Sequence, residues 1–86
     1  MASYNIEIKK SAAKELQRIP GKDQERIITR IQKLSDDPRP DGCIKLSGEE
    51  KYRIRQGNYR ILYQIHDDRL TIVVVRIADR KNAYRH

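Results

Sequence analysis

Two hydrophobic periodicities divide this chain near residue 35. In the first part, Tyr4, Ile6 and Ile8 alternate with polar residues, which predicts a short strand, and the two segments that follow have helical spacing. From residue 43 onward, apolar residues recur at every second position, which is the period of half-buried strands. The pattern therefore predicts one strand, two helices and then a group of strands.

The two helical segments are "AAKELQRI" (residues 12–19) and "KDQERIITRIQKL" (residues 22–34). Ser11 is the predicted N-cap of the first helix, and Pro20-Gly21 ends it. Because the connection is short, the two helices are expected to form an antiparallel pair. The buried stripe predicted for the second helix consists of Ile27, Ile28, Ile31 and Leu34. The basic residues of that helix are interpreted as a solvated face: Lys22, Arg26, Arg30 and Lys33.

The prolines and the glycine of "SDDPRPDG" make residues 35–42 a loop. Four strand candidates follow it: "CIKLS" (43–47), "KYRIRQ" (51–56), "YRILYQIH" (59–66) and "LTIVVVRIA" (70–78). Gly57-Asn58 and Asp67-Asp68 are predicted to be two-residue turns between the last three strands. The predicted fold class is α+β in the order β-α-α-β-β-β-β, with both helices on one face of a twisted, mostly antiparallel sheet. Residues 1–86 are predicted to form a single domain.

The turn at Gly57-Asn58 sets a register in which Gln56 lies opposite Tyr59. Ile54 then faces Ile61 and Tyr52 faces Tyr63, so this side of the sheet is the predicted core face. A two-residue turn at Asp67-Asp68 extends the register to three further pairs: Ile65 with Leu70, Tyr63 with Ile72, and Ile61 with Val74.

The same register gathers arginines on the other side of the sheet. Arg55 falls opposite Arg60, with Arg53 two residues along, and like charges in such positions repel each other. The neighbours expected on that side are apolar: Leu62, Val73 and Val75. Glu49 and Glu50 just upstream are one source of neutralising charge, and arginine side chains also extend readily into water. Because that face of the hairpin carries no acid, an anion site is favoured, and phosphate fits arginine's planar fork.

The charge of the chain is consistent with such a site but does not establish it. Nineteen lysines and arginines against twelve acidic residues give a net charge of +7. A value this large in 86 residues indicates either a polyanionic partner or a solubilising surface.

The remaining composition excludes several other kinds of chemistry. Cys43 is the single cysteine, so no internal disulfide forms, and it is interpreted as a small apolar residue rather than a catalytic thiol. His66 and His86 lack metal-ligand spacing, so neither a metal nor a cofactor is expected. The segment "MASYNIEIKK" lacks the apolar run of a signal peptide or membrane span, which predicts a cytoplasmic protein with no membrane partner.

The last residues, "RIADRKNAYRH", add a chemical group to the cations. Arg80, Lys81 and Arg85 extend the positive region, and these charges favour the phenolate form of Tyr84, which accepts a proton. Tyr84 is alternatively a packing anchor or a platform on which a base stacks. RNA carries its own nucleophile in the 2′-hydroxyl, so arginines that stabilise phosphoryl charge, plus one activated tyrosine, suffice for cleaving RNA.

The stretches "KLSG", "YRIRQGNYRILYQI" and "RIADRKNAYR" resemble the RelE/ParE superfamily of bacterial toxins. Within it, the chain looks closest to the RelE-type endonucleases, which cleave messenger RNA in the ribosomal A site. The resemblance implies three kinds of partner: the 70S ribosome with its mRNA, an acidic antitoxin that folds on binding, and operator DNA through the antitoxin complex alone.

The resemblance also assigns roles to individual residues. Arg60 matches the phosphate-binding arginine, Arg80 matches the arginine that stabilises the transition state and donates a proton, and Tyr84 matches the general base. Arg53 and Arg55 stand where the best-known members have lysines, which keeps the charge and removes a side chain better able to exchange a proton. The interval from Arg80 to Tyr84 is shorter than in the best-studied member. The remaining cations expected to bind RNA are Lys81 and Arg85.

Two other functions are compatible with the same residues. A ParE-like protein inhibits DNA gyrase by binding and has no nuclease activity, although it shares the fold and the basic charge. A simple basic RNA-binding module is the third interpretation. The combination of Arg53, Arg55, Arg60, Arg80 and Tyr84 favours the nuclease, because a gyrase inhibitor needs no set of residues that cleaves phosphodiesters.

Overall fold

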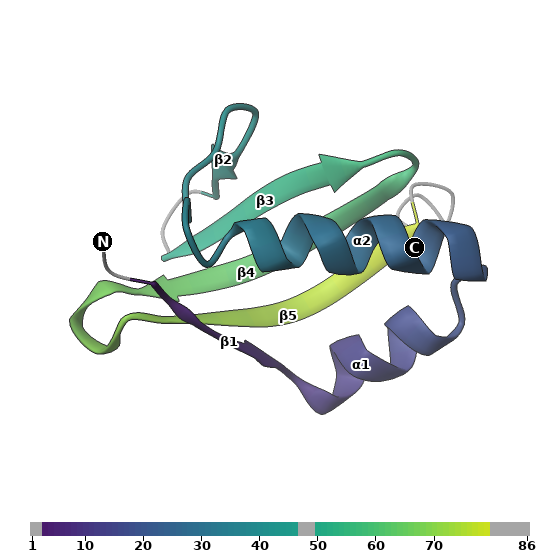
Figure 1. Ribbon diagram of the computed structural model, residues 1–86, viewed down its shortest axis with the longest axis horizontal. Helices are drawn as coiled ribbons and strands as arrows, with labels where there is room; N and C mark the ends of the chain where they lie inside the picture. The colour runs from purple at the N-terminus through teal and green to yellow at the C-terminus, as the bar shows by residue number, and fades with distance from the viewer. Residues whose placement is uncertain (1–2, 47–49, 80–86) are drawn as a thin grey trace.

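A computed structural model describes residues 3–46 and 50–79 and confirms the predicted order of elements. In chain order these are β1 (Asn5–Ile8), α1 (Lys10–Gln17), α2 (Gly21–Lys33), β2 (Ile44–Lys45), β3 (Lys51–Gln56), β4 (Tyr59–His66), a short 3-10 turn η1 (Asp67–Arg69) and β5 (Thr71–Asp79). The strands form one sheet in the order β1-β5-β4-β3-β2. β1 pairs with β5 in parallel and the other pairs are antiparallel, so the fold is α+β with a mostly antiparallel sheet (Figure 1).

α1 begins two residues earlier than its sequence predicts. Lys9 occupies the N-cap position without a side-chain hydrogen bond, so the prediction that Ser11 caps this helix is wrong. The Lys9 N–H still donates to the Val74 carbonyl at 2.9 Å, and the Lys9 carbonyl already accepts from Ala13. The chain therefore passes directly from β1, which pairs with β5, into the helix, and these backbone bonds take the place of a side-chain cap.

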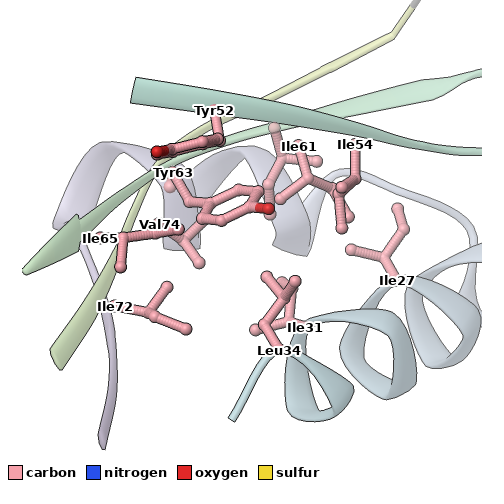
Figure 2. Close-up of a cluster of buried hydrophobic side chains, with 12 residues drawn as sticks. Ile27, Ile31, Leu34, Tyr52, Ile54, Ile61, Tyr63, Ile65, Ile72 and Val74 are labelled. Carbon is pink, nitrogen blue, oxygen red and sulfur yellow. The ribbon is translucent and has the colours of Figure 1, made fainter. Parts of the chain in front are cut away.

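The helices cover one face of the sheet and close the core with it. Figure 1 shows α2 running back across the sheet after α1. Tyr63, Ile54 and Ile61 from the sheet are fully buried against Ile27, Ile31 and Leu34 of the helical half (Figure 2). Ile28 is 36% exposed, so its predicted place in the buried stripe is wrong. Successive helical residues are about 100° apart, and the narrow stripe at helical spacing leaves Ile28 at its margin.

The β3–β4 hairpin has the predicted register throughout. Gln56 pairs with Tyr59 and Arg55 with Arg60, and the pairing continues to Lys51 opposite Gln64. Gly57 has a φ of +60°, which matches the first central position of a type II′ turn. This turn suits the right-handed twist of two strands joined by two residues.

The β4–β5 turn differs from the prediction. Asp67–Arg69 form the 3-10 turn η1, and Leu70 has left-handed backbone angles (φ 46°, ψ 50°) before β5 begins. The loop is therefore two residues longer than expected, and the first pair of the hairpin is His66 with Thr71. The three predicted pairings between β4 and β5 are wrong, and the observed pairs include Ile65–Ile72, Tyr63–Val74 and Ile61–Ile77.

Candidate nucleic-acid interface

The side of the sheet away from the helices gathers four arginines, which we call the arginine face: Arg53, Arg55, Arg60 and Arg76. Tyr52, Ile54, Ile61 and Tyr63 are buried beneath the helices. Since neighbouring residues of a strand point to opposite faces, the arginines next to them, Arg53, Arg55 and Arg60, point away from the core. Arg76 joins them through its pairing with Leu62. Arg55 lies opposite Arg60, as the sequence predicts. Arg55 is exposed, while Arg53 and Arg60 are half-buried.

Aliphatic side chains separate the cations of this face. Arg53 pairs with Ile44 of β2 on one side and with Leu62 of β4 on the other, and Leu62 pairs in turn with Arg76 of β5. One row across four strands therefore reads Ile44, Arg53, Leu62, Arg76. Ile44 is 49% exposed and Leu62 is half-buried, so the guanidinium groups stand beside apolar surface. Such surroundings strengthen the attraction of the cations for an anion, because they exclude water.

Arg76 is the member of this face that the sequence prediction missed. A register shift between Leu62 and Tyr63 inserts a β-bulge, so Val74 pairs with Tyr63 while Arg76 pairs with Leu62. A strictly alternating β5 would place Arg76 on the core side and Ile77 in solvent. The bulge exchanges them, and Ile77 is 2% exposed. An arginine at a core position of the pattern "VVVRI" is the sequence feature that indicates such a bulge.

Glu15 of α1 holds Arg76 at the edge of the sheet. Its Oε1 accepts the Ile77 N–H at 3.0 Å, and its Oε2 lies 3.5 Å from Arg76 Nε. β1 ends at Ile8, opposite Val74, so beyond Val74 the side of β5 that faces away from β4 has no neighbouring strand among the described residues. A cleft of about 390 Å³ opens beside it, lined in part by Glu15, Arg76 and Tyr59.

The predicted site residues Arg80, Lys81, Tyr84 and Arg85 lie outside the described residues. β5 ends at Asp79, the residue before Arg80 in the chain, and Asp79 pairs with Tyr59. The arginine face thus accounts for Arg53, Arg55 and Arg60 of the predicted set, and the placement of the other four remains a prediction.

Three tyrosines of the described part are poor candidates for the general base. Burial and the nearby Asp23 carboxylate raise the pKa of Tyr59, and burial raises the pKa of Tyr63 far above its usual value. The hydrogen bond to Asp67 raises the pKa of Tyr4. All three hydroxyls therefore hold their protons at neutral pH. Tyr52 and Tyr63 belong to the core, which confirms their structural interpretation.

Other kinds of site find little support in the part of the chain that the structure describes. Its His, Cys, Asp and Glu side chains contain no group of three that could hold a metal ion. Cys43 packs against the core, in agreement with its interpretation as a small apolar residue. None of the described helices has the length and apolar character needed to cross a membrane.

Comparison with known proteins places this chain in a family. Residues 6–84 match the family described as "ParE toxin of type II toxin-antitoxin system, parDE". A chain of Methanocaldococcus jannaschii that carries the toxin name RelE1 is 30% identical, with 96% of this chain and 97% of that one covered. The RelE–RelB complex of Pyrococcus horikoshii contains a chain with a TM-score of 0.83 and 28% identity, which covers 98% of this chain and 99% of its own. A chain of the RelBE2 toxin–antitoxin complex of Mycobacterium tuberculosis has the same TM-score with 26% identity, at 93% and 94% coverage.

These matches define a class: the chain is a toxin of the type II toxin–antitoxin kind. It belongs to the ParE toxin family and, with its RelE-named relatives, to the RelE-like members of the RelE/ParE superfamily.

Proposed function

We propose that this toxin is an endoribonuclease that cleaves translated messenger RNA in the ribosomal A site. The observation that carries the proposal is the register of the β3–β4 hairpin, which sets Arg55 opposite Arg60 with Arg53 beside Leu62. Arginines gathered in this way on an apolar surface suit a phosphodiester, because each guanidinium offers two parallel N–H donors to phosphate oxygens. The RelE names of several relatives support the same activity.

The proposed reaction uses the nucleophile that RNA itself provides. The 2′-oxygen attacks the adjacent phosphorus, its proton passes to Tyr84, and the bond to the 5′-oxygen breaks to give a 2′,3′-cyclic phosphate and a 5′-hydroxyl. Arg60 and Arg80 hold the phosphate and stabilise the charge that develops on it, and Arg80 donates a proton to the leaving oxygen. The side chains that position the message are Arg53, Arg55, Lys81 and Arg85. This mechanism requires no metal ion.

The proposal includes a protein partner. The solved complexes of RelE chains with RelB from two organisms support an antitoxin that covers this chain. Because the toxin carries a net charge of +7, we expect an acidic segment that folds on binding. Operator DNA would be bound through the toxin–antitoxin complex alone, and the site of action would be the cytoplasm, where ribosomes and mRNA are present.

Expression of the chain in bacteria without its antitoxin tests the proposal. We expect incorporation of labelled amino acids to stop within minutes while DNA synthesis continues, and primer extension on a reporter message should reveal cuts within the translated region. The matched family is described as ParE, which favours a second candidate, an inhibitor of DNA gyrase. Filamentation and an SOS response with intact messages would establish that candidate instead.

The role of Tyr84 is tested by Tyr84→Phe, which keeps the ring and removes the hydroxyl. Loss of the proton acceptor should slow cleavage on programmed ribosomes by about 10²-fold or more, within the range typical of general base catalysis. A variant that cleaves at the wild-type rate would show that Tyr84 only stacks and that another group accepts the proton.

A further inference from the structure

A second concentration of positive charge lies on the helix side of the molecule, where α2 passes the end of β3. A hollow of about 320 Å³ opens there, and the residues that line it are Glu25, Arg26, Thr29, Arg30, Lys33 and Gln56. We call it the basic hollow. Five of these residues belong to α2, and four of them stand at positions i, i+3, i+4 and i+7 on one flank of the helix: Arg26, Thr29, Arg30 and Lys33. The sequence interpretation treats these cations as a solvated face, and it does not anticipate that they border a hollow.

The cations of the basic hollow are not neutralised by ion pairs within the part of the chain that the structure describes. Arg26, Arg30 and Lys33 form no ion pair with any carboxylate of residues 3–46 and 50–79. Glu25 is the single acid in the lining and forms no such pair either. Like charges four residues apart on a helix destabilise it. An anion bound between these cations replaces their mutual repulsion with attraction to the anion. The Thr29 hydroxyl and the Gln56 amide add neutral hydrogen-bond donors.

The basic hollow and the arginine face lie on opposite sides of one strand. Gln56 lines the hollow, and its neighbour Arg55 belongs to the arginine face. β2 pairs only with Tyr52 and Arg53, so from Ile54 to Gln56 the edge of β3 has no neighbouring strand among the described residues. Among the described residues, this open edge leaves a path from one basic surface to the other on which no strand stands.

We infer that the basic hollow is a second phosphate-binding site and that its ligand is the sugar–phosphate backbone of RNA. The choice of RNA rests on the proposed function, while the choice of an anion rests on the charges and the shape of the hollow. The phosphates come either from the message, beyond the nucleotide held at the arginine face, or from ribosomal RNA beside it. Neither source requires base contacts, because backbone phosphates bind cations irrespective of sequence.

The test compares two triple variants that remove the same charge. The hollow variant removes the cations of the basic hollow and carries Arg26→Gln, Arg30→Gln and Lys33→Gln. The α1 variant is the control and replaces three exposed lysines near α1: Lys9→Gln, Lys10→Gln and Lys14→Gln. Binding is measured by fluorescence anisotropy with a fully 2′-O-methylated 12-mer, which no 2′-hydroxyl mechanism cleaves, and by co-sedimentation with vacant 70S ribosomes. A double variant of Arg26 and Lys33 leaves the half-buried Arg30 in place, in case the triple variant does not fold.

We expect the hollow variant to bind at least one RNA roughly tenfold more weakly than the α1 variant, with a salt slope lower by up to about 2 if three phosphate contacts are lost. Loss confined to the 12-mer identifies the message as the source of the phosphates, and loss confined to ribosomes identifies ribosomal RNA. Equal binding by both variants in both assays would overturn the inference. Intact RNA binding with weakened binding of poly-glutamate would instead assign the hollow to an acidic polypeptide.

These measurements do not depend on cleavage. If the wild-type chain leaves messages intact while the hollow variant binds RNA more weakly than the α1 variant, the proposed nuclease is contradicted and the second site is supported. A wild-type chain that cleaves messages, with a hollow variant that binds both RNAs as tightly as the α1 variant does, contradicts the second site alone.

Discussion

The direction of single side chains determines which face of the sheet is charged and which forms the core. Tyr63 is fully buried, and its hydroxyl donates to the Pro38 carbonyl at 2.7 Å, so the one polar atom of this side chain is satisfied. Its ring stacks on Tyr52 with the centroids 5.9 Å apart. The neighbours of Tyr63 along β4 point the other way and contribute to the outer face. A strand of alternating residues thus supplies a satisfied apolar core and a charged surface at once.

Removing the hydroxyl of Tyr63 should show how much its hydrogen bond to Pro38 stabilises the fold. Tyr63→Phe leaves the Pro38 carbonyl without its donor and should lower the free energy of unfolding by about 1 kcal/mol at pH 7. Because burial raises the pKa of Tyr63, its stabilising contribution is fully present below the ordinary tyrosine pKa of about 10 and is lost as the pH rises further. The difference between wild type and variant in urea titrations should therefore shrink above pH 10. A constant difference from pH 7 to pH 11 would contradict the buried, protonated hydroxyl.

At the scale of elements, the end of β5 depends on α1. Because β1 ends at Ile8, no residue of β1 lies beside Ile77, and the Ile77 N–H donates its hydrogen bond to the Glu15 carboxylate instead. The same carboxylate reaches Arg76, so one residue of the helix satisfies a strand edge and orients a member of the arginine face. An occupied edge is also protected from pairing with another strand.

Substitutions at Glu15 test its role at the strand edge. Glu15→Ala removes the acceptor of the Ile77 N–H and should cost about 1 kcal/mol of unfolding free energy, whereas Glu15→Gln retains an acceptor oxygen and should cost less. Amide exchange at Ile77 should accelerate in the alanine variant. Lys14→Ala, a change at the exposed neighbour, serves as the control and should leave both quantities unchanged. Equal exchange rates at Ile77 in all three variants would rule out the capping role of Glu15.

The elements of this fold differ in how far their sequence determines them. The β3–β4 hairpin is predictable to the residue, because a glycine-containing two-residue turn and alternation on both sides fix the same register. The β4–β5 connection is not, since Asp67-Asp68 suits either a two-residue turn or the first turn of a 3-10 helix, and Leu70 adopts left-handed angles that a leucine rarely takes. The bulge at Leu62 and Tyr63 depends on tertiary packing, which buries Ile77 and turns Arg76 outward. For this reason three arginines of the site follow from the sequence and Arg76 does not.

At the scale of the whole molecule, a polar cluster at one end of the sheet joins four distant segments. Asp67 accepts the Tyr4 hydroxyl at 2.6 Å and Arg39 Nη2 at 2.9 Å. The Arg39 guanidinium also lies 5.2 Å from the centre of the Tyr52 ring, and its Nε donates to the Tyr52 hydroxyl. The cluster therefore links the N-terminal segment, the loop after α2, β3 and the β4–β5 turn. Because its charged groups are about half exposed, salt should weaken it.

Acid should release this cluster. Hydrogen bonds from Arg39 and Tyr4 lower the pKa of Asp67, so its contribution to stability is present above the ordinary aspartate pKa of about 4 and is lost as the pH falls through the lower folded value. Asp67→Asn should lower the urea midpoint at pH 7, and this deficit should disappear toward pH 2. Asp68→Asn, at the exposed neighbour, is the matched control and should behave as wild type. A deficit of Asp67→Asn that persists unchanged at pH 2 would show that the aspartate charge contributes nothing.

The architecture as a whole leaves one face of a small sheet free of helices, where the proposed substrate binds, and packs the other face into the core. The helices, the buried tyrosines and the isoleucines hold β3 and β4 in the register that sets Arg55 opposite Arg60. Every further step of the proposed function depends on a phosphodiester that binds at this place.

The most direct test is the cleavage of an end-labelled message on programmed 70S ribosomes by three purified chains: wild type, Arg60→Ala and Arg69→Ala. The control Arg69→Ala loses the same charge as Arg60→Ala, but Arg69 lies in the turn beyond the far end of β4, roughly 20 Å along the strand from Arg60. We predict that wild type and Arg69→Ala cut the message to leave a 2′,3′-cyclic phosphate and a 5′-hydroxyl, and that Arg60→Ala is slower by about 10²–10³-fold while its melting temperature is unchanged. A wild-type chain that leaves the message intact, or an Arg60→Ala variant that cuts as fast as wild type, would contradict the account.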